Sequence, residues 1–210
     1  MSTDWDAAYR EGVMPWDKGA AAPPLLEWLE GPGHCFEGEV LVPGCGLGHD
    51  VRAIAATGQA RAVCGLDISP AAVEMARRLP AVDGETYLQA DLFDLPPELH
   101  GHFDWVFEHT CFCALQPNLR RDYVRAVAQA LRPAGYLLAI FYLDPWKKGE
   151  APPPGGGPPF GVTREELDGL FGPQFELLEE KAPTRAFPGR AGAETVRLLR
   201  RIEGALPNGV

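Results

Sequence analysis

Residues 39–48, Glu39-Val-Leu-Val-Pro-Gly-Cys-Gly-Leu-Gly48, decide the fold of this chain. Their first half is a short apolar run with β-branched valines, which is typical of a buried strand, and their second half is a glycine-rich tight turn. The segment after the turn, residues 50–57, is rich in apolar residues and is followed by Gly58, so it predicts a helix. A strand, a turn and a helix in this order are the first unit of a parallel sheet.

The same alternation of strands and helices continues along the chain. Ser69 and Pro70 predict the start of a second helix, and Thr163 with Glu166 three residues later predicts the start of the last one. In all we expect strands at residues 39–43, 61–66, 86–89, 103–107, 136–142, 174–180 and 194–202, and further helices at 70–79 and 118–131. This pattern predicts an α/β fold: a seven-stranded, mostly parallel, Rossmann-like sheet with helices on both faces, in a single domain over residues 1–210.

The charge of the chain excludes some partners. It carries 19 basic and 29 acidic side chains and a formal net charge of −10. Because phosphate binding depends on lysine and arginine, this balance argues against nucleic acid as a partner, and it also disfavours anionic membranes. No basic segment followed by an apolar one opens the chain, and no run of about 18 apolar residues occurs. We therefore expect a cytoplasmic protein without nucleic-acid or membrane partners.

The five cysteines predict neither a disulfide framework nor a metal site. Their number is odd and their positions show no paired spacings, which is unlike a secreted disulfide scaffold. Cys111 and Cys113 stand close to His109, but no second cysteine or histidine pair completes a set of four metal ligands. We expect no metal.

A cluster of acidic and glycine-rich features falls where the first four predicted strands end. These are the turn Gly44–Gly48, Asp67, Asp91 and Glu108. The carboxyl ends of parallel strands meet at one edge of the sheet, where ligands of open α/β sheets bind. Glycines there let a ligand approach the backbone, and Asp67, 23 residues after Gly44, suits a hydrogen bond to a ribose diol. The sequence therefore predicts a nucleoside-containing ligand.

The identity of that ligand follows from what the turn lacks. A dinucleotide fingerprint requires glycine at its sixth position, where this chain has His49, and the lysine of a phosphate-binding loop is absent. A glycine-rich, acidic and cation-poor site suits an adenosyl ligand without phosphate and with positive charge, and S-adenosylmethionine fits. Two alternatives stay open: a nucleotide-linked Rossmann oxidoreductase and a non-catalytic S-adenosylmethionine-binding protein.

The chain resembles the thiopurine S-methyltransferase superfamily, and within it most closely the halide/thiol methyltransferase branch. The resemblance rests on Trp5–Gly19 (WDAAYREGVMPWDKG), 42–50 (VPGCGLGHD), 65–69 (GLDIS), 103–114 (FDWVFEHTCFCA) and 183–185 (PTR). It spans about residues 5–200. It implies a monomeric methyltransferase that uses S-adenosylmethionine and acts on small soft nucleophiles: thiols, hydrosulfide, thiocyanate, halide or thiopurine-like thiols.

The resemblance also implies which residues hold the cofactor. Residues 1–30 form a covering arm, His109 faces the reactive end of the cofactor, and Cys45, Gly46 and Ile68 belong to the matched motifs. The other implied contacts are Trp5, Tyr9 and Trp16 over the cofactor, Gly44 at its methionine part, Asp67 at the ribose, and Asp91 and Leu92 at the adenine. The chain departs from the family at Tyr9, where tryptophan is common, and at His109, where tyrosine is common.

The spacing of the aromatic residues supports a covering arm independently. Trp5 and Tyr9 lie four residues apart, on one face of a short predicted helix. Aromatic rings attract a sulfonium cation by about 0.5–2 kcal/mol. The alternative is that these rings only pack the arm onto the domain.

The expected reaction is an in-line displacement at the sulfonium methyl group, so the protein mainly positions and desolvates the reactants. His109 and Glu108 are the candidate catalytic residues. His109 can accept a proton from a thiol or, when charged, attract an anion, and otherwise it is structural; Glu108 is alternatively a hydrogen-bonding acid at the strand end.

Phe112 and Tyr142 are candidates for an apolar substrate pocket, or else they belong to the core. Arg185, which lies with Arg190 in a predicted turn between the last two strands, is a candidate for attracting an anionic substrate or a surface ion pair. Residues 144–162, rich in proline and glycine, predict a surface loop or a substrate lid.

Overall fold

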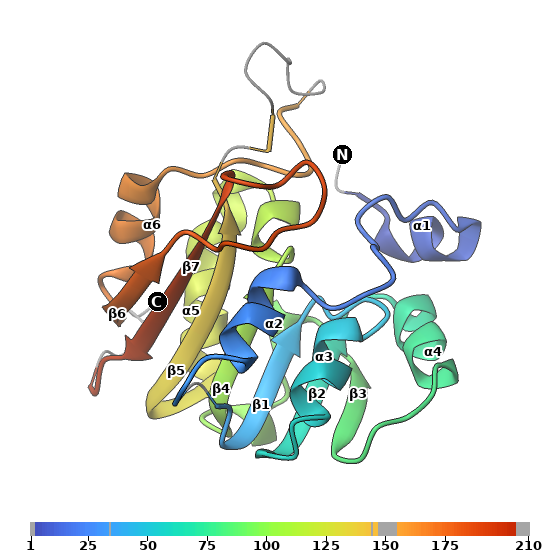
Figure 1. Ribbon diagram of the computed structural model, residues 1–210, viewed down its shortest axis with the longest axis horizontal. Helices are drawn as coiled ribbons and strands as arrows, with labels where there is room; N and C mark the ends of the chain where they lie inside the picture. The colour runs from blue at the N-terminus through green and yellow to red at the C-terminus, as the bar shows by residue number, and fades with distance from the viewer. Residues whose placement is uncertain (1–2, 34, 144, 147–154, 205–210) are drawn as a thin grey trace.

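The computed structural model describes residues 3–33, 35–143, 145–146 and 155–204. Within these residues, seven strands form one sheet in the order β3-β2-β1-β4-β5-β7-β6 (Figure 1). The strands are β1 (Gly38–Pro43), β2 (Ala60–Asp67), β3 (Glu85–Gln89), β4 (Phe103–His109), β5 (Leu131–Tyr142), β6 (Phe175–Lys181) and β7 (Glu194–Arg201). Strands β1 to β5 pair in parallel, and β7 runs antiparallel to both β5 and β6. The predicted seven-stranded, mostly parallel sheet is confirmed.

Helices cover both faces of the sheet, as predicted (Figure 1). The helices are α1 (Trp5–Glu11), α2 (Pro23–Leu29), α3 (His49–Ala55), α4 (Pro70–Arg78), α5 (Arg120–Ala130) and α6 (Arg164–Phe171). Side chains alternate between the two faces along a strand. Thus Val40 and Val42 join the apolar core under α2, α3 and α4, whereas Leu41 between them joins the core under α5 and α6.

The helix starts follow the local sequence signals. Ser69 accepts a hydrogen bond from the Ala72 amide, and Thr163 accepts one from the Glu166 amide, so both act as N-caps. The Glu166 carboxylate, the second part of the predicted capping box, pairs with Arg120 Nη1 at 2.6 Å. Helix α2 was not predicted, although prolines at its first two positions are compatible with a helix start.

The end of the proline- and glycine-rich segment is anchored to the core. Residues 144 and 147–154 lie outside the described residues, so the expectation of a lid over 144–162 stays a prediction. The Phe160 amide donates to the Cys113 carbonyl at 2.7 Å. Arg120, which is 2% exposed, donates to the carbonyl oxygens of Phe160 at 3.3 Å and Gly161 at 2.8 Å. One buried guanidinium therefore joins this segment to α5 and α6.

Among the described residues, no helix combines the length and the apolar character needed to span a membrane. The five cysteines are all free thiols. No group of three histidine, cysteine or acidic side chains in the described part of the chain is placed to bind a metal ion.

Candidate active site

A cleft opens where β1 and β4 end, between the N-terminal arm and the glycine turn. Six of the predicted site residues line it. The lining residues are Tyr9, Trp16, Asp17, Lys18, Ala20, Val42, Gly44, Cys45, Gly46, Leu47, His49, Asp50, His109, Thr110 and Phe187. The structure thus brings the arm, the glycine turn and His109 together, as the sequence predicted.

The turn after β1 needs its glycines. Gly44 and Gly46 have φ angles of 59° and 52°, a region that residues with a side chain rarely adopt. A Cβ atom at Gly44 would come within 2.9 Å of Cys111 Sγ. The open backbone of this turn forms one wall of the cleft, which fits close approach of a cofactor.

Asp67 holds the turn in place. Its Oδ2 accepts a hydrogen bond from the Gly46 amide and its Oδ1 accepts one from the Ser69 amide, both at 2.9 Å. Burial raises the pKa of Asp67, which is 5% exposed, and the two amide bonds act in the opposite direction. Asp67 does not line the cleft, although each of its carboxylate oxygens keeps capacity for a second donor.

The aromatic arm lies over this turn. Trp16 meets Trp5 edge-on at a centroid distance of 5.2 Å and Tyr9 at 5.6 Å, and its Nε1 donates to the Tyr9 hydroxyl at 3.2 Å. Tyr9 is buried, and its hydroxyl would be 2.8 Å from a Cβ atom on Gly46. Tyr9 and Trp16 therefore lie next to the glycine turn, whereas Trp5 contacts Trp16 and does not line the cleft.

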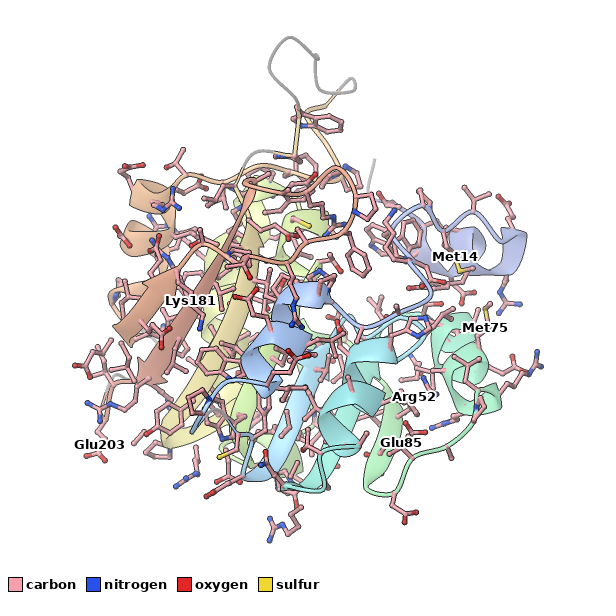
Figure 2. All side chains as sticks on the ribbon, in the orientation of Figure 1. Met14, Arg52, Met75, Glu85, Lys181 and Glu203 are labelled. Atoms are coloured by element: carbon pink, nitrogen blue, oxygen red, sulfur yellow. The ribbon has the colours of Figure 1, made fainter. Side chains whose placement is uncertain are left out.

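Helix α4 anchors the arm through a carboxylate and two methionines. Asp6 Oδ1 accepts hydrogen bonds from the Ser69 hydroxyl at 2.8 Å and the Ala71 amide at 2.9 Å. Met14 of the arm and Met75 of α4 face each other in the same small apolar cluster (Figure 2). The bond from the Ala71 amide, together with those from Arg10 and Ser69, lowers the pKa of Asp6 to about 2.

Replacing Asp6 with alanine is expected to loosen the arm, because the start of α4 loses its acceptor. The lowered pKa gives the sign of the pH effect: the Asp6 contribution is complete above its ordinary pKa of 3.8 and is lost as the pH falls through about 2. Tryptophan fluorescence should shift to longer wavelength in D6A at neutral pH, and the exposed control E11Q should match the wild type. Identical spectra of D6A and wild type would contradict this anchor.

The predicted adenine contacts lie farther along the same edge of the sheet. Asp91 accepts a hydrogen bond from the Phe93 amide at 2.9 Å and so caps the short turn 92–94. Leu92 is buried, and Ile68 is half exposed at the end of β2. None of these three lines the cleft itself, so their role toward the cofactor stays a proposal.

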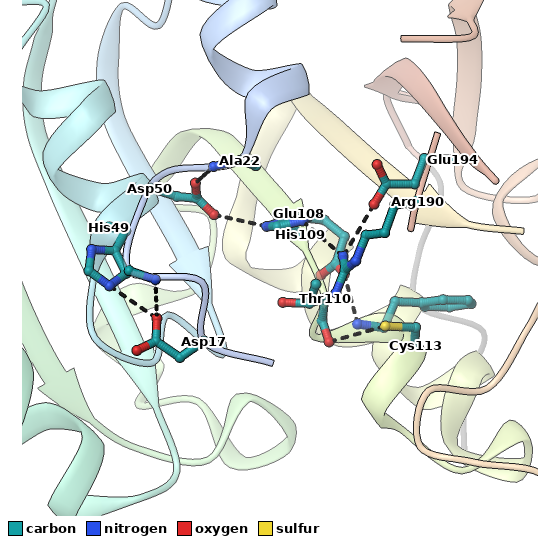
Figure 3. A network of polar contacts seen from close by, with 12 residues as sticks. Asp17, Ala22, His49, Asp50, Glu108, His109, Thr110, Cys113, Arg190 and Glu194 are labelled. Atoms are coloured by element: carbon teal, nitrogen blue, oxygen red, sulfur yellow. Dashed lines mark hydrogen bonds and ion pairs between the residues drawn. The ribbon is translucent and has the colours of Figure 1, made fainter. Parts of the chain in front are cut away.

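A chain of polar contacts crosses the cleft wall (Figure 3). His109 Nδ1 lies 3.1 Å from Asp50 Oδ2, and His109 Nε2 lies 3.4 Å from Arg190 Nη1. Arg190 also donates to Glu194 Oε1 at 3.2 Å, and the Ala22 amide donates to Asp50 Oδ1 at 2.7 Å. Asp50 and Arg190 were not among the predicted site residues, although Asp50 ends the Val42–Asp50 motif.

Glu108, a predicted catalytic residue, does not line the cleft. Glu108 is 1% exposed and turns into the core, where Oε1 accepts a hydrogen bond from the Phe112 amide at 2.7 Å and Oε2 accepts one from the Tyr123 hydroxyl. Burial raises its pKa to about 7, against the effect of these bonds. It is the hydrogen-bonding strand-end acid of the alternative interpretation, because successive residues of β4 point to opposite faces.

None of the three predicted substrate residues lines the cleft. Phe112 is 1% exposed and packs against Tyr123, Phe141 and Phe171, so it belongs to the core. Arg185 pairs with Glu30 at 2.7 Å on the surface. Tyr142, the third, lies under the guanidinium of Arg190, 4.8 Å from its ring centroid.

The comparison with known families decides the identity of this site. The model of the family described as thiopurine S-methyltransferase (TPMT) matches residues 1–201. The chain belongs to this family. The TPMT-family protein is therefore an S-adenosylmethionine-dependent methyltransferase, and the resemblance inferred from its motifs is confirmed.

Individual relatives agree with the family assignment. The TPMT-family chain is 31% identical to thiocyanate methyltransferase 1 of Arabidopsis thaliana, over 94% of this chain and 84% of that one. It is 30% identical to a thiopurine S-methyltransferase of Xanthomonas campestris pv. campestris, over 85% and 86%. Its fold is similar to that of the 1,6-didemethyltoxoflavin-N1-methyltransferase of Burkholderia thailandensis, solved with S-adenosylhomocysteine, with a TM-score of 0.68, 20% identity and coverage of 95% and 86%.

Proposed function

We propose that this methyltransferase acts on a small soft nucleophile: a thiol, hydrosulfide, thiocyanate, halide or thiopurine-like thiol. The observation that carries the proposal is the position of His109, which lines the same cleft as the glycine turn Gly44–Gly46. An acceptor bound at His109 therefore shares the cleft with a cofactor bound at the turn. The names of the relatives, which refer to thiocyanate and thiopurine, support this class of acceptor.

The proposal assigns the cofactor contacts as follows. S-adenosylmethionine supplies an electrophilic methyl group when it is bound. Gly44, Cys45 and Gly46 form the backbone cradle, and Asp67 accepts from the ribose. Tyr9 and Trp16 exclude water from above and attract the sulfonium with their rings, which fits their position over the turn. The adenine lies toward Ile68, Asp91 and Leu92, and all these parts belong to a single domain.

A panel of acceptors tests the function. Release of S-adenosylhomocysteine is measured with simple thiols, hydrosulfide, iodide, thiocyanate and selenium or tellurium oxyanions. We expect turnover with at least one of them. Binding of S-adenosylhomocysteine without turnover on the whole panel would indicate a non-catalytic binding protein. A thermal shift with NAD(H) and none with S-adenosylmethionine would indicate a nucleotide-linked oxidoreductase.

We propose further that the enzyme works as a cytoplasmic monomer without nucleic-acid partners. The net charge of −10 disfavours polyanions, and five free cysteines suit a reducing compartment. Light scattering of the purified protein with and without DNA tests the oligomeric state and the absence of binding.

A further inference from the structure

We infer that Asp50 is a positioning residue that holds His109 as a base for neutral thiols, which makes the enzyme favour thiols over acceptors that carry no proton, such as thiocyanate. The inference rests on the proposed function and names the acceptor class within it. It starts from the contacts on the two ring nitrogens of His109 (Figure 3).

The two contacts assign the proton on the imidazole. A guanidinium has only donors, so the contact between Arg190 Nη1 and His109 Nε2 requires Nε2 to accept. A neutral imidazole carries one N–H, which then lies on Nδ1 and donates to Asp50 Oδ2 at 3.1 Å. The lone pair of Nε2 is therefore the basic site of this ring.

The ring is held in this orientation from several sides. The His109 side chain is 9% exposed, and Phe187 stacks on it with an interplanar angle of 26°. The other oxygen of Asp50 accepts from the Ala22 amide at 2.7 Å, which fixes the carboxylate. Asp50 thus orients His109 in the way that a carboxylate commonly fixes the tautomer of a functional histidine.

Nε2 can exchange its partner for a substrate. Its contact with Arg190 is long at 3.4 Å, whereas Arg190 has a second acceptor in Glu194 at 3.2 Å and lies over the Tyr142 ring. An S–H group that enters the cleft can therefore replace Arg190 at Nε2 while Arg190 keeps its other contacts. The guanidinium then stands next to the sulfur and favours its anionic form.

The proton and electron balance of the step is complete. The S–H proton moves to His109 Nε2, and the electron pair left on sulfur forms the bond to the methyl carbon. The electrons of the broken carbon–sulfonium bond leave with S-adenosylhomocysteine. Asp50 stabilises the resulting imidazolium, which later gives its proton to water. Thiocyanate has no proton to transfer, so it does not need this base.

Other charged groups surround His109. Asp17 and Lys18 come from the arm, His49 from α3, Glu108 from β4, and Glu194 from β7. Lys18 donates to the Pro15 carbonyl and His49 pairs with Asp17. Among the described residues, Asp50 and Arg190 are the charged side chains for which a direct contact with the His109 ring is observed.

The size of the expected effect follows from thiol ionisation. A thiol with a pKa near 8.5 is about 3% ionised at pH 7 and about 90% ionised at pH 9.5. A variant without the base must use the thiolate already present, so H109Q should lose about 30-fold in kcat/KM for the thiol at pH 7 and be close to wild type at pH 9.5. D50N should lose about 10-fold at pH 7, since the carboxylate no longer holds the ring with the proton on Nδ1 and the lone pair on Nε2.

The experiment compares kcat/KM for free cysteine, whose thiol has a pKa near 8.5, and for thiocyanate at both pH values in wild type, H109Q and D50N. The ratio of the kcat/KM values for the two acceptors cancels any effect on cofactor binding. The matched control is D122N, which removes a carboxylate from an exposed ion pair with Arg125. The expected result is a loss confined to the thiol at pH 7. Equal losses on both acceptors, or a thiol loss that persists at pH 9.5, would overturn the inference.

A second readout does not depend on turnover. Nitrogen-15 NMR of the cofactor-free protein reports which ring nitrogen of His109 carries the proton. We expect the Nδ1–H form in wild type and D122N, and a shift toward the Nε2–H form in D50N. A wild-type protein with the Nε2–H form would contradict the role of Asp50. If no acceptor in the panel is methylated, the proposed function fails, and the NMR result still decides the tautomer.

Discussion

Replacing Asp67 with alanine should reduce the affinity for S-adenosylhomocysteine by at least about 100-fold, which corresponds to about 2.7 kcal/mol. The variant leaves the amides of Gly46 and Ser69 without their acceptor, at a cost of about 1–3 kcal/mol for each buried donor. The same carboxylate is the proposed partner of the ribose, so the cradle and the ligand contact are lost together. Isothermal titration calorimetry measures the effect.

Two further variants make this result interpretable. D67N keeps one acceptor oxygen but presents an amide NH₂ to the second amide donor, so it should bind more weakly than wild type even when D67A does not fold. D83A removes an exposed carboxylate and should bind like the wild type. Unchanged affinity in a folded D67A or D67N would refute the ribose assignment.

Arg120→Met should lower the free energy of unfolding by about 1–3 kcal/mol, because it removes the hydrogen bonds of a buried charged donor, whereas its partner Glu166 is 40% exposed. The guanidinium is 2% exposed, binds Glu166 and two carbonyl oxygens, and lies over the Phe112 ring at 5.1 Å. Methionine fills part of the volume but satisfies none of these acceptors.

Urea unfolding followed by circular dichroism measures the loss. The adjacent Arg121 is exposed and provides the matched control, so R121M should change stability by no more than about 0.5 kcal/mol. If R120M and R121M were equally stable, Arg120 would not be the anchor that joins residues 160–161 to α5 and α6.

The strands, and the residues at their carboxyl ends, could be predicted because buried strands and the turns that follow them have clear sequence patterns. Val40, Val42 and Val63 mark buried strands, and each parallel strand delivers its last residue to the same edge, so the sequence was enough to predict that Asp67 and the glycine turn lie at one edge of the sheet. Helix α2 was missed because seven residues with two leading prolines give little periodicity.

The residues proposed to bind the methyl acceptor were harder to predict, because they lie in loops and single turns without a regular sequence pattern. Phe112 follows a strand as a site residue would, but the single turn 112–114 aims it into the core. Arg185 and Arg190 lie in one loop without periodicity, and only the path of that loop shows that Arg190 reaches His109 while Arg185 pairs with Glu30. Asp50 resembled an ordinary acid in the first turn of a helix.

The antiparallel strand β7 brings the loop that precedes it to the cleft. Because β7 is reversed against β5, the residues that precede it arrive at the edge where β1 and β4 end. Connections between parallel strands are long and usually contain a helix, whereas residues 182–193 join the antiparallel strands β6 and β7 with no helix between them. Their length and composition can change without moving any strand that carries the cofactor site. Substitutions in this one hairpin loop are therefore expected to change the surroundings of His109 without displacing the glycine turn after β1.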